Sequence, residues 1–210
     1  MEIISHRGYW FKNSEKNSDL AFRRSFSLSF GTETDIRDFD GELVISHDVA
    51  NKNCITIEKF FEIYKSIEIQ SSLALNIKSD GLQNLLKKSL KQNNINNYFV
   101  FDMSIPDTIM YLKEGMNVFI RQSEHEPGTS FYESATGIWL DAFDGVWYSE
   151  ELVKKHLNNG KKVAIVSSEL HSREYLKHWT LLKSWNIINN DNLILCTDLP
   201  EKAFNFFKNE

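Results

Sequence analysis

The chain has 210 residues, of which 41% are hydrophobic and 25% are charged, so it is long enough to bury the core of one sizeable globular domain. Its formal net charge of −5 leaves no basic footprint for wholesale binding to nucleic acid or to an anionic membrane. Any anionic substrate must therefore be met by locally placed positive charge. The two cysteines, Cys54 and Cys196, are far apart and not in a metal-like spacing, so the sequence indicates neither a disulfide framework nor a zinc site.

The first residues, MEIISHRGYW, contain no basic region followed by an apolar run, and no other apolar run is long enough to cross a bilayer. We therefore expect a cytoplasmic protein with no stable membrane insertion and no nucleic-acid partner. The sequence does not indicate an oligomeric state.

Short β-rich apolar runs alternate with longer amphipathic segments along the chain. The predicted strands, in chain order, are 2–5, 31–36, 72–78, 98–103, 117–122, 137–141, 161–166 and 192–197. The predicted helices are 16–29, 57–66, 82–91, 106–113, 150–157, 173–184 and 201–208. Because a helix follows most of the strands, the pattern predicts an α/β fold, a compact TIM-type (β/α) barrel that forms a single domain over residues 1–210.

A short β-hairpin is predicted after the second strand, because the Asp-Gly pair at 40–41 tolerates positive φ at both turn positions. The outgoing strand places Glu33, Asp35 and Arg37 on one face, since successive side chains of a strand point to opposite faces. The returning arm brings His47 near these acids. Buried charge is costly unless it is paired or bound to a cation, so this face borders either water or a functional site.

Further polar residues end the neighbouring strands. His6 and Arg7 follow the first strand, whereas Asn76 and Lys78 are expected to point inward from the third strand. The carboxyl ends of barrel strands share one rim, which is where such barrels carry out their chemistry. The rim would then combine oxygen ligands suited to a hard cation, two imidazoles that titrate near neutral pH, and two cations for an anionic group. The alternative is a solvated strand edge with local ion pairs.

Four segments together resemble the glycerophosphodiester phosphodiesterase family: ISHRG at 4–8, EKNS at 15–18, the segment GTETDIRDFDGELVISHD at 31–48, and CTDLP at 196–200. The resemblance implies a TIM-type barrel that hydrolyses a small-molecule phosphodiester of lipid metabolism. It also implies a divalent cation, Mg²⁺ or Ca²⁺, held by carboxylates. The residues that match the family pattern are His6 and His47 as catalytic acid and base, Arg7 and Lys78 as substrate-binding residues, and Glu33, Asp35 and Asn76 as metal ligands.

The chain departs from the family pattern at two positions. Asn76 replaces a glutamate, and its amide oxygen can coordinate a cation without bringing charge, so Asp102 is a further candidate for the metal shell. Lys16 replaces a glutamate that commonly precedes Asn17. A weakly catalytic or non-catalytic barrel that binds a phosphodiester or sugar phosphate is therefore the alternative function.

Other polar residues are expected to have structural roles. Asp48 is a candidate for orienting a histidine, although strand alternation is expected to point it away from His47. His156 and His178 are expected at the surface, as is His125. Glu169, which follows the seventh strand, is an additional candidate for contact with the substrate.

Overall fold

The computed structural model describes residues 1–67 and 71–208. Its contacts divide the chain into two compact units. Residues 5–118 form what we call the N-terminal unit, and residues 1–4 with 119–210 form the C-terminal unit. The expected single-domain organisation over residues 1–210 stays a prediction.

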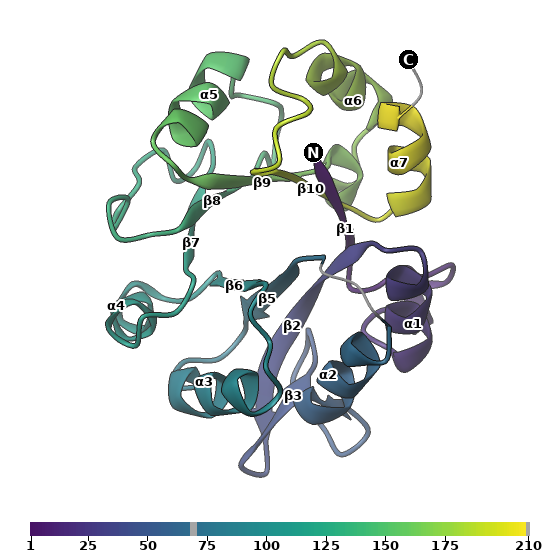
Figure 1. Ribbon diagram of the computed structural model, residues 1–210, viewed down its shortest axis with the longest axis vertical. Helices are drawn as coiled ribbons and strands as arrows, with labels where there is room; N and C mark the ends of the chain where they lie inside the picture. Colours follow the sequence, from purple (N-terminus) through teal and green to yellow (C-terminus); the bar gives the residue numbers. More distant parts are fainter. Residues whose placement is uncertain (68–70, 209–210) are drawn as a thin grey trace. The chain divides into compact units, whose positions relative to one another are not determined.

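The N-terminal unit is a mixed sheet covered by helices (Figure 1). Strand β2 pairs in parallel with β5, and β5 pairs in parallel with β6, whereas the hairpin strands β3 and β4 run antiparallel. Its strands are β2 (Gly31–Phe39), β3 (Glu42–Ile45), β4 (Ile55–Thr56), β5 (Leu73–Ile77), β6 (Tyr98–Phe101) and the end of β1 (Glu2–His6). Its helices are η1 (Asn13–Glu15), α1 (Asp19–Ser27), α2 (Ile57–Lys65), α3 (Gln83–Gln92) and α4 (Ile105–Lys113).

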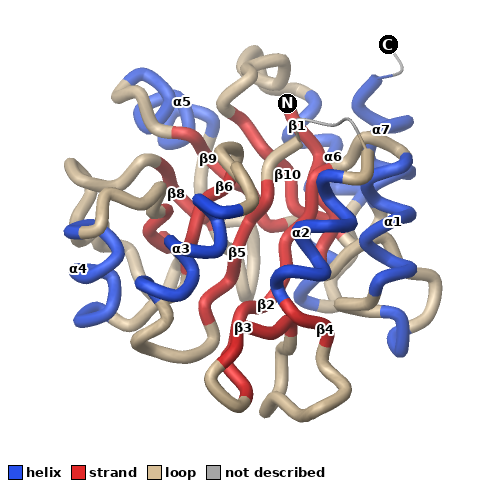
Figure 2. The backbone as a smooth tube through the Cα atoms, turned by 60° about the horizontal axis from the view of Figure 1, so that its bottom comes forward, coloured by secondary structure: helices blue, strands red, loops and turns tan. Residues whose placement is uncertain are grey.

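The predicted hairpin after the second strand is confirmed. Asp40 and Gly41 adopt φ values of 51° and 80°, which are the left-handed conformations that a two-residue hairpin turn requires. The turn sets the register of β2 against β3, from Phe39 opposite Glu42 to Ile36 opposite Ile45. Figure 2 shows β3 and β4 beside the end of β2. The hairpin therefore brings the residues after Ile45 back beside Asp35 of β2.

Helix α1 begins three residues later than the sequence pattern indicates. Ser18 has an extended backbone, and its hydroxyl accepts a hydrogen bond from the Ala21 amide, so Ser18 is the N-cap. Residues 13–15, which precede the predicted helix, form a short 3₁₀ turn. The sequence pattern missed this boundary, and the consequence is that Lys16 and Asn17 lie in a loop.

Helices α1 and α2 pack together through an aromatic cluster. The rings of Phe22 and Phe60 lie 4.7 Å apart, and those of Phe26 and Tyr64 lie 5.3 Å apart, each pair in an edge-on arrangement. All four side chains are buried. Burial of each such side chain contributes roughly 2 kcal/mol, so this cluster anchors the loops at both helix starts.

The C-terminal unit is a parallel sheet in the order β1-β10-β9-β8-β7 (Figure 1). Its strands are the start of β1, β7 (Phe119–Gln122), β8 (Gly137–Leu140), β9 (Lys162–Val166) and β10 (Leu193–Thr197). Its helices are α5 (Glu150–Asn158), η2 (Ser168–His171), α6 (Leu176–Lys183) and α7 (Pro200–Lys208). The eight predicted strands and seven predicted helices are all present in the two units, with ends shifted by a few residues.

Two histidines of the C-terminal unit are buried, so their predicted surface position is wrong. His156 and His178 are each only 3% exposed. Both ring nitrogens of His178 are hydrogen-bonded, to the hydroxyls of Tyr148 and Ser168, and burial lowers its pKa to about 4. The polar residues around both histidines in the sequence suggest that their side chains are exposed. In the fold, hydrogen bonds to residues distant in the sequence pair the ring nitrogens inside the unit.

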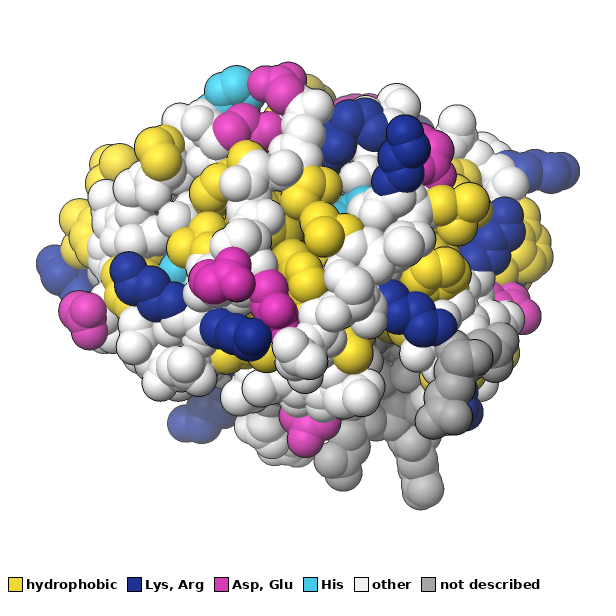
Figure 3. Space-filling view, turned by 90° about the horizontal axis from the view of Figure 1, so that it is seen from above, with side chains coloured by type: hydrophobic (Ala, Val, Ile, Leu, Met, Phe, Trp, Pro, Cys, Tyr) yellow, Lys and Arg dark blue, Asp and Glu magenta, His cyan; other side chains and the backbone are white. Residues whose placement is uncertain are grey.

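Charged side chains of both signs are interspersed on the face shown in Figure 3, and hydrophobic side chains gather near the centre of the view. Within residues 1–67 and 71–208, none of the helices combines the length and the apolar character that a bilayer span needs.

Candidate active site

The acidic face of β2 is buried. Glu33 is 1% exposed and Asp35 is fully buried, so the reading of this face as a solvated strand edge is wrong. The parallel register of β2 with β5 places Asp35 opposite Asn76, whose side chain is also buried. Three oxygen-bearing side chains from two adjacent strands are thereby held in the interior of the N-terminal unit.

One oxygen of each of these side chains has no hydrogen-bond partner within residues 1–67 and 71–208. These atoms are Glu33 Oε2, Asp35 Oδ1 and Asn76 Oδ1, and all three are buried. Buried acceptors without donors are costly, so such groups usually bind something that completes them. Carboxylate and amide oxygens are the ligands that Mg²⁺ and Ca²⁺ prefer, and the donor set therefore fits a hard divalent cation.

Burial perturbs the titration of Glu33. Removal from water, followed by repulsion from Asp35, raises the pKa of Glu33 from 4.5 to about 7. The nearby positive groups oppose this rise without cancelling it. Without a bound cation, Glu33 is therefore protonated in a large fraction of molecules at neutral pH.

Two cations lie against Asp35. Arg7 Nε is 3.1 Å from Asp35 Oδ2, and Lys78 Nζ is 3.5 Å from Asp35 Oδ1. Lys78 Nζ is also 3.5 Å from an Asp102 oxygen, so Asp102 is oriented toward a lysine. Asp102 directly follows β6, which ends at Phe101, and its backbone is left-handed with φ of 73°. Positive charge thus lies beside the buried carboxylate oxygens.

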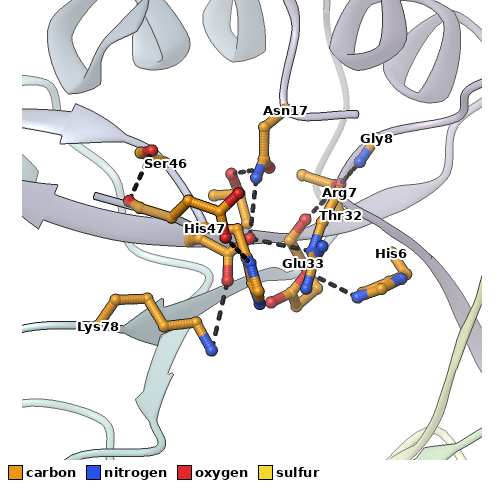
Figure 4. Close-up of polar contacts among 12 residues, drawn as sticks. His6, Arg7, Gly8, Asn17, Thr32, Glu33, Ser46, His47 and Lys78 are labelled. Carbon is orange, nitrogen blue, oxygen red and sulfur yellow. Dashed lines mark hydrogen bonds and ion pairs between the residues drawn. The ribbon is translucent and has the colours of Figure 1, made fainter. Parts of the chain in front are cut away.

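The two predicted catalytic histidines come from different elements. His6, at the end of β1, has its Nε2 atom 3.9 Å from Glu33 Oε2, and its side chain is 15% exposed. His47 follows β3 and has a side chain that is 45% exposed. Figure 4 shows His6, Glu33, Arg7, His47 and Lys78 gathered in one group.

The His47 ring is held by its neighbour. His47 Nδ1 lies 2.8 Å from Asp48 Oδ1, and this hydrogen bond keeps the pKa of Asp48 below its usual value. The expectation that Asp48 points away from His47 is wrong, because β3 ends at Ile45 and strand alternation does not extend to these residues. Arg37 donates to the His47 carbonyl, and the Ser46 amide donates to the Asp35 carbonyl, so this turn is anchored to β2.

Asn17 is a site residue that the sequence reasoning did not select. Its Nδ2 donates to Asp35 Oδ2 over 2.8 Å, and its Oδ1 accepts from the Thr34 hydroxyl over 2.9 Å. Its backbone amide donates to the Arg7 carbonyl. Asn17 therefore positions both Asp35 and the Arg7 loop. Its place in the EKNS segment was the signal that could have identified it.

Candidate residues of the C-terminal unit have other partners. Glu169 accepts hydrogen bonds from the hydroxyls of Ser167 and Thr197 and from the Asp198 amide, so it ties the ends of β9 and β10 together.

In the described part of the chain, the His, Cys, Asp and Glu residues that could share a metal ion form one group of three: Glu124, His125 and Asp144. His125 and Asp144 are exposed, and exposed groups of this kind are common without an ion. His125 lies at the surface, as predicted.

Comparisons with known proteins identify the fold. No protein-family model matches the sequence, and the curated proteins give no match either. Solved structures do match over the whole chain. A structure assigned to a glycerophosphodiester phosphodiesterase of Galdieria sulphuraria has a TM-score of 0.77 at 15% identity, with 99% of this chain and 98% of that chain covered.

Two further structures agree. The glycerophosphodiester phosphodiesterase of Agrobacterium tumefaciens has a TM-score of 0.73 at 11% identity, with both chains covered completely. A phosphodiesterase of Oleispira antarctica, solved with its product sn-glycerol-3-phosphate, has a TM-score of 0.70 at 14% identity and covers 100% of this chain and 97% of that chain. The protein has the TIM-type barrel fold of these structures, as the sequence predicts.

Proposed function

We propose that the protein is a metal-dependent phosphodiester hydrolase that acts on a glycerophosphodiester or a related phosphate-linked alcohol. The observation that carries the proposal is a set of three buried oxygens, on Glu33, Asp35 and Asn76, that accept no hydrogen bond from the described residues. His6, His47, Arg7 and Lys78 lie around them (Figure 4). Fold alone does not define function, so these side chains carry the proposal.

Glu33, Asp35 and Asn76 would hold the divalent cation. When bound, a Mg²⁺ or Ca²⁺ ion supplies Lewis-acid neutralisation of the phosphate charge. Asn76 contributes an oxygen without charge, so the ligand set has one negative charge fewer than a set with three carboxylates. The raised pKa of Glu33 means that this residue loses a proton when it becomes a ligand.

Arg7 and Lys78 bind the phosphate in this proposal. Arginine presents several N–H donors that match phosphate oxygens, and lysine adds a compact positive charge. Both side chains contact Asp35 and are about 19% exposed, so they border the buried oxygens and remain accessible. Asn17 fixes Asp35 and therefore fixes the position of the Arg7 guanidinium.

His6 and His47 exchange the protons of the reaction. The nucleophile, a neighbouring substrate hydroxyl or a water, loses a proton to one imidazole while the other protonates the leaving oxygen. The Asp48 contact at His47 Nδ1 leaves Nε2 for the substrate and holds the ring orientation. Attack by a neighbouring hydroxyl gives a cyclic phosphate, whereas attack by water gives the open phosphomonoester directly.

The substrate class is supported by the Oleispira antarctica structure, which contains sn-glycerol-3-phosphate as product. We propose that this chain acts on a small molecule that contains the same phosphate-linked glycerol. The family resemblance of the segment 31–48 agrees with this substrate.

A hydrolysis screen tests the proposal. Glycerophosphodiesters, lysophospholipids and phosphate-linked glycans are incubated with Mg²⁺, Ca²⁺, Mn²⁺ or chelator, and released phosphomonoester and alcohol are measured. We expect cation-dependent hydrolysis that His6→Gln and His47→Gln remove, whereas His125→Gln, on an exposed residue of the C-terminal unit, retains it. Binding of phosphodiesters without hydrolysis would instead support the non-catalytic barrel.

A further inference from the structure

An open cavity of about 670 Å³ adjoins the candidate active site in the N-terminal unit. Arg7 and His47, which belong to the site, also line this cavity. The rest of its wall comes from the β1–α1 loop, the loop after β3 and the first turn of α2. We call it the alcohol cavity. Its volume is in the usual range for a small-molecule site.

The charge balance of the alcohol cavity is positive, because Arg7, Lys16 and Lys59 line it against two carboxylates, Asp19 and Asp48. Asp19 pairs with Arg23 and Lys59 pairs with Glu62, whereas Asp48 is hydrogen-bonded to His47. Within the described residues, Lys16 forms no ion pair. An ammonium without an ion pair therefore lies in the same wall as Arg7.

The Lys16 ammonium is held against an aromatic ring. Its Nζ lies 4.3 Å from the centroid of Trp10, and the Trp10 indole donates to the His6 carbonyl. The side chain is only partly exposed, so its position is restricted. A free aromatic face can bind a cationic ligand group, but Lys16 already occupies this face of Trp10. A cationic ligand group would therefore be repelled there by the Lys16 ammonium.

The wall also offers uncommitted amides. In the part of the chain that the structure describes, the side-chain amides of Asn13 and Asn53 form no hydrogen bond. Asn51 uses its Oδ1 to accept from the Asn53 backbone amide and keeps its Nδ2 available. Side-chain amides both donate and accept, which is the chemistry that recognises hydroxyl groups.

We propose that the alcohol cavity binds the alcohol linked to the scissile phosphate, and that it selects a hydroxyl-rich alcohol bearing an anionic group. This inference rests on the proposed function, since it assigns the substrate class of the same site. Lys16 supplies the attraction for the anionic group, and the amides of Asn13, Asn51 and Asn53 meet the hydroxyls. Alcohols with a positive charge are disfavoured by the same ammonium.

The test compares three substrates that differ in the charge of the alcohol. They are glycerophosphoglycerol, glycerophosphoglycerol with a phosphate on its terminal hydroxyl, and glycerophosphocholine. Values of kcat/KM are measured for the wild type, Lys16→Glu and the matched control Lys52→Glu. Lys52 is an exposed residue of the loop after β3 that is not among the lining residues, and its substitution makes the same change in net charge.

We expect the wild type to prefer the phosphorylated alcohol over choline, and Lys16→Glu to lower this ratio by about tenfold through KM, as expected for a partly exposed charge reversal. Lys52→Glu should change the ratio by less than about twofold. If the substrates are hydrolysed but the two variants change the ratio of kcat/KM values equally, or do not change it, the inference is overturned. The proposed function then remains intact.

A second measurement separates the two proposals. If none of the substrates is hydrolysed, the proposed function fails, and binding of the phosphorylated substrate is then followed by calorimetry. Binding that Lys16→Glu weakens and Lys52→Glu retains supports the alcohol cavity. Absence of binding, or equal binding by both variants, overturns it.

Discussion

Neutralising Glu33 should stabilise the metal-free protein at alkaline pH. The folded state raises the pKa of Glu33 from 4.5 to about 7, so the folded protein holds this proton more tightly than the unfolded chain. Stability from this group is therefore full below pH 4.5 and decreases as the pH rises toward 7. At about 1.4 kcal/mol per pKa unit, the loss is about 3 kcal/mol above pH 7.

The measurement is urea unfolding of the wild type and Glu33→Gln in chelator at pH 5 and pH 8. The gain of the variant over the wild type should be about 2 kcal/mol larger at pH 8 than at pH 5. Glu42→Gln, on an exposed residue of β3, is the control and should show no such pH difference. An equal gain at both pH values would refute the reasoning, because it would mean that Glu33 titrates normally.

Cation binding provides the complementary result. If Glu33 is a ligand, Mg²⁺ or Ca²⁺ binds the ionised form, so the apparent affinity should rise about tenfold per pH unit below pH 7. The wild-type Tm should therefore increase more on adding the cation at pH 8 than at pH 5. Glu33→Gln should lose this response and the hydrolytic activity together.

Three further outcomes are expected. Asn76→Glu should lower the cation concentration for half-maximal rate and Asn76→Ala should raise it; an affinity indifferent to both would exclude Asn76 as a ligand. His6→Gln and His47→Gln should each lower kcat by about 10²- to 10⁴-fold with unchanged circular dichroism, and full activity in either would contradict the acid-base assignment. Gly137→Ala should destabilise by about 3 kcal/mol or more in thermal unfolding, because a Cβ there would lie 2.4 Å from the Phe119 ring; a wild-type Tm would contradict that packing.

The sequence by itself determined the order of elements and the hairpin, and it indicated the candidate site residues apart from Asn17. Hydrophobic alternation and turn chemistry are local properties, so the Asp40-Gly41 turn and the strands of both units could be predicted from short segments. The separate segments that carry His6, Glu33 and His47 had to be joined by the family resemblance, since their spacing along the chain does not by itself show proximity.

The tertiary structure decided burial and pairing. Whether the acids of β2 border water or a site depends on the strands and helices that cover them, and only the fold shows Glu33 and Asp35 buried. The contacts of Asn17 with Asp35 and of Asp48 with His47 depend on a loop and on the end of a strand, where side-chain periodicity no longer applies. The ammonium of Lys16, which the sequence identified only as a departure from the family pattern, acquires its proposed role from the cavity that the fold builds around it.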